Sequence, residues 1–73
     1  MSNLPRIAEL LDRGEQVYMK DDFYEVAIRI ETPMVTWLKH RDHAEVLVPH
    51  GYDTACQIEL GGEFITKEEY ENY

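Results

Sequence analysis

The side chains of this sequence with the widest chemical capacity are three imidazoles, a carboxylate and a thiol between positions 40 and 56. They are His40, His43, His50, Asp53 and Cys56. Such groups ligate divalent transition metals, and a catalytic zinc ion requires only three protein ligands. Their spacing is not that of an established zinc motif, and a strand over residues 44–48 would separate His43 from His50 by roughly 20 Å. We therefore expect no metal and no other cofactor, and a melting temperature raised by zinc and lowered by a chelator would contradict this.

Acid–base and nucleophilic catalysis find equally little support. The carboxylates occur as adjacent pairs, Asp21 with Asp22 and Glu68 with Glu69, whereas glycosidase-type catalysis needs two carboxylates that face each other across a cleft. A domain of 73 residues also leaves little volume for a substrate pocket of ~300 Å³ or more. We expect a protein that is not an enzyme, and a small metal-dependent enzyme built on His40, His43 and Asp53 is the alternative.

The first element that must support any site is an amphipathic helix at the N-terminus. Asn3 can cap this helix and Gly14 can end it, because asparagine accepts hydrogen bonds from a first helical turn and glycine suits the end of a helix. Its apolar residues recur at helical spacing, which predicts that one side packs on other elements. These residues are Leu4, Ile7, Leu10 and Leu11.

The middle of the chain predicts a small antiparallel sheet. Strands are expected over residues 16–20, 23–31, 34–39, 44–48, 54–60 and 63–65, with Asp21-Asp22 and Gly61-Gly62 as hairpin turns. In the longest strand the core side is expected to consist of alternate residues, namely Tyr24, Val26, Ile28 and Ile30. The predicted fold class is α+β, with an N-terminal helix packed on a sheet of four or five strands. An exposed strand edge near residues 16–20 is a place where a partner peptide could pair.

The end of the chain has two readings. Thr66 and Glu69 have capping-box spacing, so residues 66–72 can form one or two helical turns, or residues 66–73 can fray into an acidic tail. Tyr70 and Tyr73 are expected to be exposed in either case. Residues 1–73 should form one domain without a disulfide, because the chain has a single cysteine. The longest uncharged run, over residues 32–38, is too short to span a bilayer, which predicts a cytoplasmic protein.

Charge is the strongest functional signal. Residues 42–73 hold eight acidic residues and one lysine, a formal charge of −7, within a chain of net charge −8. A field of one sign disfavours nucleic acid and membrane surfaces and attracts basic protein surfaces. We expect a monomer that binds such a surface, although a solvated acidic surface that only aids solubility fits the composition as well. The candidate binding residues are Tyr18, Phe23, Trp37, Tyr52, Asp53, Glu59, Glu63, Glu68, Glu69, Tyr70 and Glu71.

In length, acidity and the close Glu68-Glu69-Tyr70-Glu71-Asn72-Tyr73, the chain resembles the small acidic early proteins with which lytic bacteriophages take over a host enzyme. Within that group it is similar to the inhibitors and antiterminators that bind bacterial RNA polymerase. The resemblance implies a regulator in the host cytoplasm that binds polymerase subunits, blocks promoter use through the initiation factor and lets elongation pass terminators. It assigns no binding residues, because no residue motif carries it.

A second hypothesis is an acidic inhibitor that mimics nucleic acid and blocks a host defence nuclease or a CRISPR or restriction complex. Carboxylates at positions i and i+2 of a strand lie about 6.7 Å apart and can imitate a row of phosphates. The one expected strand with several carboxylates carries Glu25 and Glu31 on one side, and Arg29 interrupts them. Mimicry would therefore require rows formed across strands.

Overall fold

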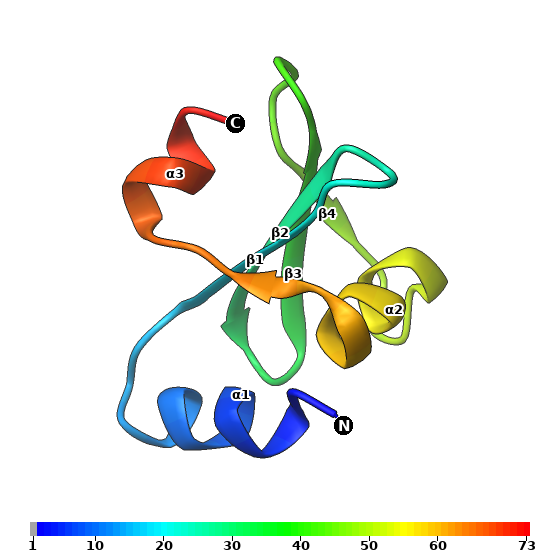
Figure 1. Ribbon diagram of the computed structural model, residues 1–73. Coiled ribbons are helices and arrows are strands. Elements are labelled where there is room, and N and C mark those ends of the chain that lie inside the picture. Colours follow the sequence, from blue (N-terminus) through cyan, green and yellow to red (C-terminus); the bar gives the residue numbers. More distant parts are fainter. Residues whose placement is uncertain (1) are drawn as a thin grey trace.

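The computed structural model describes residues 2–73, which fold into a five-stranded antiparallel sheet with three helices (Figure 1). In chain order the elements are α1 (Leu4–Asp12), β1 (Val17–Asp21), β2 (Val26–Thr32), β3 (Val35–His40), β4 (Val46–Val48), α2 (Asp53–Gly61), β5 (Glu63–Phe64) and α3 (Lys67–Glu71). The strand order is β4-β3-β2-β1-β5, so only β5 joins the sheet out of chain order. The predicted α+β class, with an N-terminal helix on a small antiparallel sheet, is confirmed.

Alternation along the central strand β2 gives the sheet two different faces. Val26, Ile28 and Ile30 are buried on one face, whereas Arg29 belongs to the other, because successive side chains of a strand point to opposite sides. The register continues this pattern into β1, where Met19 lies opposite Ile28. The two faces consequently receive different side chains from every strand.

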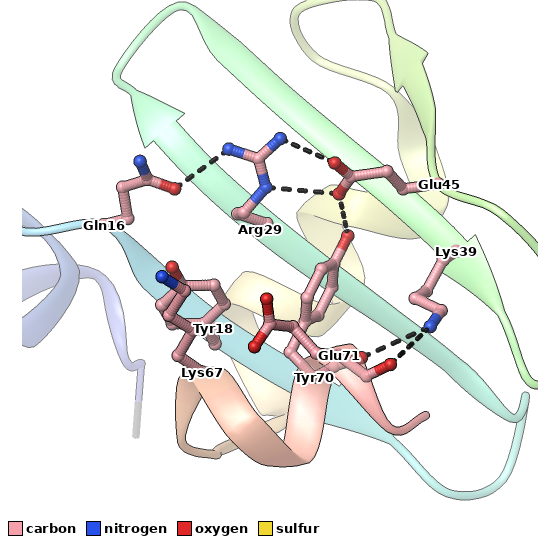
Figure 2. Close-up of a pocket in the computed structure, with 8 residues that line it drawn as sticks. All are labelled: Gln16, Tyr18, Arg29, Lys39, Glu45, Lys67, Tyr70 and Glu71. Atoms are coloured by element: carbon pink, nitrogen blue, oxygen red, sulfur yellow. Dashed lines mark hydrogen bonds and ion pairs between the residues drawn. The ribbon is translucent and has the colours of Figure 1, made fainter.

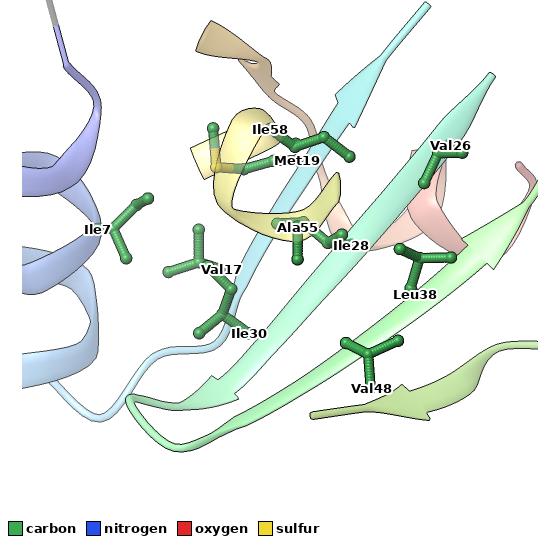
Figure 3. Packing of buried hydrophobic residues seen from close by; sticks show 10 residues of the cluster. All are labelled: Ile7, Val17, Met19, Val26, Ile28, Ile30, Leu38, Val48, Ala55 and Ile58. Atoms are coloured by element: carbon green, nitrogen blue, oxygen red, sulfur yellow. The ribbon is translucent and has the colours of Figure 1, made fainter. Parts of the chain in front are cut away.

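The first face is covered by α1 and α2 and encloses a wholly apolar core (Figures 1 and 3). Ile28 from β2 and Ile58 from α2 are fully buried there, and burial of one such side chain contributes about 1.5–3 kcal/mol. The core residues are Ile7, Val17, Met19, Val26, Ile28, Ile30, Leu38, Val48, Ala55 and Ile58.

The second face is covered in part by α3 and has a smaller, aromatic core. Ala27, Tyr70 and Tyr73 are buried in it, with Tyr18 and Ile65 packed alongside. The rings of Tyr18 and Tyr70 lie 5.4 Å apart between centroids, a distance typical of favourable aromatic pairs. The end of the chain is therefore part of the fold.

The strand predicted over residues 54–60 is wrong, because this segment is the helix α2. The prediction followed the alternate residues Cys56, Ile58 and Leu60, but only Ile58 of these is fully buried and Leu60 is exposed. The residues that meet the sheet are instead Ala55 and Ile58, three positions apart as on one side of a helix. A segment this short fits both the two-residue period of a strand and the 3.6-residue period of a helix. Packing on the sheet decides between the two.

The predicted Gly61-Gly62 hairpin turn is also wrong. Gly61 ends α2 and Gly62 follows as its C-cap, in an extended conformation. A Cβ atom at Gly62 would lie 2.7 Å from the carbonyl oxygen of Ile58 and 2.8 Å from that of Lys20. Glycine is required here because the end of α2 approaches β1 too closely for a side chain. The same residue accepts a hydrogen bond of 2.8 Å from Asn3 Nδ2, which ties α1 to the end of α2.

The predicted capping role of Asn3 is corrected by that bond. Asn3 occupies the N-cap position of α1 but makes no side-chain hydrogen bond to the first turn. Its side-chain amide donates a hydrogen bond to the Gly62 carbonyl oxygen instead. The predicted stop at Gly14 agrees with the structure, where α1 ends at Asp12 and Gly14 has a φ of +79°, which is accessible to glycine at no steric cost.

The second predicted strand begins three residues too early. The carboxylate of Asp21 accepts hydrogen bonds from the backbone N–H groups of Phe23 and Tyr24, at 2.9 and 3.2 Å. An aspartate that binds the backbone two residues later makes a turn, and Glu25 completes it with a φ of 53°. The strand therefore starts at Val26, and Tyr24, expected in the core, is exposed.

The open edge of the sheet is not at residues 16–20. There β5 pairs with β1, Met19 opposite Phe64 and Lys20 opposite Glu63, and Ile65 donates a backbone hydrogen bond of 2.9 Å to Tyr18. Among residues 2–73, the strands with one unpaired side are β4 and β5.

Candidate functional site

An open pocket of about 390 Å³ lies where α3 meets the second face of the sheet (Figure 2). The expectation that so small a domain has little room for a pocket of ~300 Å³ or more is therefore wrong. The walls of the pocket come from β1, β2, β3, the segment before β4, and α3, so it brings together residues distant in the chain. The lining residues are Gln16, Tyr18, Arg29, Lys39, Glu45, Lys67, Tyr70 and Glu71. Most of them are polar, which distinguishes this face from the core on the other side.

Arg29 is the centre of this pocket. Its guanidinium donates to both carboxylate oxygens of Glu45, from Nε at 3.1 Å and from Nη2 at 2.7 Å. Nη1 donates to Gln16 at 2.9 Å and to Glu31 at 3.3 Å. A bidentate arginine–carboxylate pair has fixed geometry and is stronger than a contact between neutral groups. The pair joins the middle of β2 to the segment that precedes β4.

Tyr70 extends the network to α3. Its hydroxyl donates to Glu45 Oε2 at 2.6 Å, as Figure 2 shows. Desolvation and the adjacent Glu45 carboxylate raise the pKa of Tyr70 far above its usual value, so the phenol stays protonated and remains a donor. Glu45 therefore connects α3 to the sheet through two partners.

Lys39 holds the other end of α3. Its ammonium lies 3.4 Å from the carbonyl oxygens of both Tyr70 and Glu71 and 5.7 Å from the centroid of the Tyr70 ring. The last carbonyls of a helix have no partner within the helix and carry partial negative charge. A cation at this end therefore stabilises the last turn of α3. We call Arg29, Lys39, Glu45 and Tyr70 together the α3 anchor.

The electrostatics of the α3 anchor do not suit acid–base chemistry at neutral pH. The hydrogen bond from Arg29 is the main reason that the pKa of Glu45 is lowered, and Glu45 in turn raises the pKa of Arg29. A general acid or base works best with a pKa near the ambient pH, and these shifts move both groups away from it. The arrangement fixes charge and position, which is the chemistry of a structural anchor.

The outer side of α3 carries the predicted acidic residues. Glu68, Glu69 and Glu71 are exposed. Thr66 Oγ1 accepts from Glu69 N–H at 3.1 Å, and Glu69 Oε1 accepts from Thr66 N–H at 3.0 Å. This capping box was predicted. We call Glu68, Glu69 and Glu71 the acidic ridge, and the α3 anchor holds it in place.

The expected exposure of two tyrosines is wrong. Tyr70 is 4% exposed and Tyr73 is 7% exposed, because their rings face the sheet rather than solvent. The guanidinium of Arg41 lies 4.3 Å from the Tyr73 ring centroid, and Asp42 N–H donates to the Tyr73 carbonyl at 2.8 Å. The last residues form a helix docked on the sheet, so of the two readings the helical one agrees with the structure.

The chain neutralises nearly all of its own cations. Among residues 2–73, each arginine and Lys20 forms an ion pair with a carboxylate, and Lys39 binds the end of α3. Lys67 is the one lysine or arginine without such a contact in this part of the chain. The acidic residues outside these ion pairs are Asp12, Asp21, Asp42, Asp53, Glu59, Glu68, Glu69 and Glu71. Most of the net charge of −8 is therefore carried by these carboxylates outside the ion pairs, since the paired residues contribute seven negative charges against five positive ones.

The predicted binding residues do not form one surface. The ring of Tyr18 packs on Tyr70 of α3. Phe23 is 86% exposed in the β1–β2 turn, and Glu63 forms an ion pair with Lys20 at 3.2 Å. Tyr52, Asp53 and Glu59 belong to α2 or its N-cap on the opposite side of the sheet. The structure thus separates the set into the acidic ridge, the aromatic core beneath it, the β1–β2 turn, the β5 edge and the α2 region.

Trp37 stacks on the Arg29 guanidinium of the α3 anchor. The Arg29 guanidinium lies 5.1 Å from its ring centroid, and its Nε1–H donates to Glu31 at 3.1 Å. Leu47, opposite Trp37 in the register, is 60% exposed. The tryptophan is half-buried, and its contacts are with the anchor as much as with solvent.

Sequence reasoning missed Arg29, Glu45 and Lys39 as parts of a site. Arg29 and Lys39 could have been noticed as cations placed between apolar residues on the side of β2 and β3 opposite the core. Their partners, however, lie 16 and 31 positions away, and nothing local in the sequence indicates those contacts.

The five candidate metal ligands are spread over several elements. The rings of His40 and His43 are 6.5 Å apart between centroids, and His43 Nδ1 lies 2.8 Å from the carbonyl oxygen of Arg41. His50 and Cys56 line a separate groove near α2. Within residues 2–73, no group of three or more histidine, cysteine, aspartate or glutamate side chains is arranged to hold a metal ion.

Comparison of the chain with protein-family models, curated proteins and solved structures finds no match. None of the helices in the described part of the chain has the length and apolar composition needed to cross a membrane.

Proposed function

We propose that the protein is a non-enzymatic regulator that binds a basic surface of a larger protein. The observation that carries this proposal is the charge balance: every lysine and arginine of the described chain except Lys67 has a partner inside the molecule, and the carboxylates outside the ion pairs face solvent in large part. Unpaired charges of one sign accelerate encounter with an oppositely charged surface. Ion pairs already made within the chain cannot supply that attraction.

The acidic ridge is the part of this charge best prepared for binding. Glu68, Glu69 and Glu71 lie on α3. The capping box satisfies the first turn of this helix, and Lys39 binds the carbonyl groups of its last turn. Tyr70, between them in the sequence, fixes the same helix to the sheet through Glu45. A ridge already ordered before contact does not incur the ordering cost of a flexible tail, and that cost otherwise reduces affinity.

The target we propose is bacterial RNA polymerase, in the bacterial cytoplasm, with inhibition of initiation and antitermination as the consequences. Two considerations support this choice. A nucleic-acid enzyme presents basic surfaces to its substrate, and these attract carboxylates. The chain also resembles small acidic phage proteins in length, net charge and the residues of its acidic end. An acidic mimic of nucleic acid is the competing function, and the same experiment distinguishes the two.

The experiment is capture of partners from bacterial lysate, followed by measured association with the purified partner. Recovery of RNA polymerase subunits is the expected result. Recovery of a nuclease or a restriction or CRISPR complex would favour the nucleic-acid mimic, and recovery of no specific partner would overturn the proposal.

A charge variant then tests the acidic ridge. Glu68→Gln, Glu69→Gln and Glu71→Gln together should slow association with polymerase about tenfold at low salt and flatten its salt dependence. The capping box is retained, since glutamine serves at this position. The matched control is Glu9→Gln, Glu15→Gln and Glu25→Gln, which removes the same charge from carboxylates paired with Arg13 or Arg41. Equal effects of the two triple variants would reject a specific role for the ridge.

A further inference from the structure

A second concavity lies on the opposite side of the sheet, between α1 and α2. It has a volume of about 450 Å³ and we call it the interhelical groove. Its floor includes the core residues Ile7, Ile30 and Ala55, and its rim includes the exposed side chains of Leu4 and Tyr52. Because the floor residues are buried, the exposed apolar surface of the groove belongs to its walls and rim, where Leu4, Ala8 and Tyr52 are exposed.

The two walls of the groove have matching periodicity. On α1 the wall contains Leu4, Ala8 and Leu11, which follow one another at positions i, i+4 and i+7. The wall on the α2 side repeats the same spacing with Tyr52, Cys56 and Glu59. Residues at this spacing lie along one side of a helix. Two such rows facing a common space form the kind of groove in which a third helix packs.

The charge of the groove indicates what that helix must carry. Asp12 and Glu59 belong to its lining, and Asp53 lies in the first turn of α2 beside it. Among the described residues that line the groove, none is lysine or arginine, and His50 is its one basic side chain. None of the three carboxylates takes part in an ion pair within residues 2–73. Apolar walls with unpaired carboxylates at the edge complement an apolar strip flanked by cations.

Glu59 adds a second reason to expect a cation. The side chain is half-buried among groove residues, and desolvation raises its pKa, with the nearby His50 opposing the shift. A partly desolvated carboxylate without a cation is unfavourable. A lysine or arginine from a partner would relieve this cost, and a neutral or acidic partner would increase it.

We propose that the interhelical groove binds an amphipathic α-helix of the partner protein, with apolar residues at positions i, i+4 and i+7 and lysine or arginine on the flanks. This deepens the proposed function, because it names the segment of the partner that is recognised. The acidic ridge lies on the other side of the sheet, so the two surfaces bind different parts of a partner. The groove accommodates the side chains of one helical face, while the polar face stays in solvent.

Cys56 provides a direct probe of occupancy. It is the single cysteine of the chain, lies in the α2 wall and is half-buried. The rate of its alkylation by N-ethylmaleimide can be measured on the full chain with and without a synthetic helical peptide. The test peptide has three leucines at positions i, i+4 and i+7 with flanking lysines. In the matched peptide glutamates replace the lysines.

The lysine peptide at saturation should slow alkylation of Cys56 at least about fivefold, and the glutamate peptide should leave the rate nearly unchanged. Glu59→Gln should weaken binding of the lysine peptide about three- to tenfold. Glu63→Gln, which removes one charge outside the groove, should not weaken it. Ala8→Arg is a second variant that alters only an exposed side chain of the α1 wall. It should also weaken binding of the lysine peptide.

Absence of protection by the lysine peptide, or equal protection by both peptides, would overturn the proposal. Protection that grows with protein concentration in the absence of peptide would place a second copy of the chain in the groove, and would overturn it too. The two proposals also fail separately. If captured polymerase leaves Cys56 unprotected, the groove proposal fails and the proposed function stands. If the lysine peptide docks but no polymerase is captured, the polymerase proposal is the one that fails.

Discussion

The two faces of the sheet are stabilised by different physics. On the face covered by α1 and α2, ten buried apolar side chains meet without a polar contact among them. On the face covered by α3, three residues are buried, and one of them, Tyr70, is tied through its hydroxyl to an arginine–carboxylate pair, while a lysine binds the end of the helix. The hydrophobic contribution is roughly proportional to buried area, whereas hydrogen bonds depend on geometry and on ionisation.

This difference separates stability from positioning. The first face supplies most of the free energy that holds the domain together, because it buries most of the apolar surface. The second face fixes where α3 stands, and with it the acidic ridge. A change on the first face should therefore alter the whole fold, and a change on the second should act on α3 and on acid sensitivity.

The largest effect is expected from the first face. Ile28→Ala removes a fully buried side chain and should lower the free energy of unfolding by about 2–5 kcal/mol, a large part of the stability of so small a domain. Urea unfolding followed by circular dichroism measures it. Leu60→Ala, at an exposed position of α2, is the control and should change stability by no more than about 0.5 kcal/mol. Similar losses in the two variants would contradict the assignment of the core.

An intermediate effect with a defined pH dependence is expected from Glu45→Gln. The pKa of Glu45 is lowered in the folded protein, mainly by Arg29, so its ionised form contributes stability above the unfolded pKa. That contribution disappears as the pH falls through the folded pKa. At pH 7 we expect a loss of about 1–2 kcal/mol, a figure that allows for the part of the carboxylate that solvent reaches.

The pH profile is the sharper part of this prediction. Melting temperatures of the wild-type protein and of Glu45→Gln should converge as the pH falls through the lowered pKa of Glu45, since below it both proteins lack the ionised carboxylate. Glu31→Gln removes the more exposed carboxylate bound to Arg29 and should have a smaller effect. A constant difference between wild type and Glu45→Gln across the pH range would rule out the ion pair as its cause.

The smallest effects compare two tyrosines of the second face and have opposite signs. Tyr70→Phe removes the hydrogen bond to Glu45 and should destabilise by about 1 kcal/mol. The Tyr73 hydroxyl is buried without a hydrogen-bond partner in the described chain, so Tyr73→Phe should stabilise by a similar amount, about 1 kcal/mol. Thermal melts at one pH measure both. If both variants lose stability, Tyr73 has a partner or a packing role that its contacts do not reveal.

The parts of the fold that were predictable from sequence are those with a single dominant period. Val26, Ile28 and Ile30 alternate as a strand requires, and Leu4, Ile7 and Leu11 recur as a helix requires. Residues 54–60 fit both periods, so local pattern alone could not identify α2. The choice depends on Ala55 and Ile58 meeting the sheet, which is tertiary information.

The candidate site was less predictable for a related reason. The charge of the acidic ridge and its capping box are local features, and Thr66 with Glu69 predicted them. Arg29 with Glu45 and Lys39 with the end of α3 are contacts across the fold. Exposure was also misjudged, because Tyr70 and Tyr73 are close to many carboxylates in the sequence but lie against Ala27 in space.

The hydrogen bond from Asn3 to Gly62 spans 59 positions and has a consequence for the order of events during synthesis. It joins α1 to the end of α2, and these two helices form the walls of the interhelical groove. A nascent chain that has emerged only as far as β4 contains α1 but lacks the opposite wall. The interhelical groove can therefore be complete only after residue 62 has left the ribosome, because the α2 wall and the bond that ties it to α1 both come from the later part of the sequence.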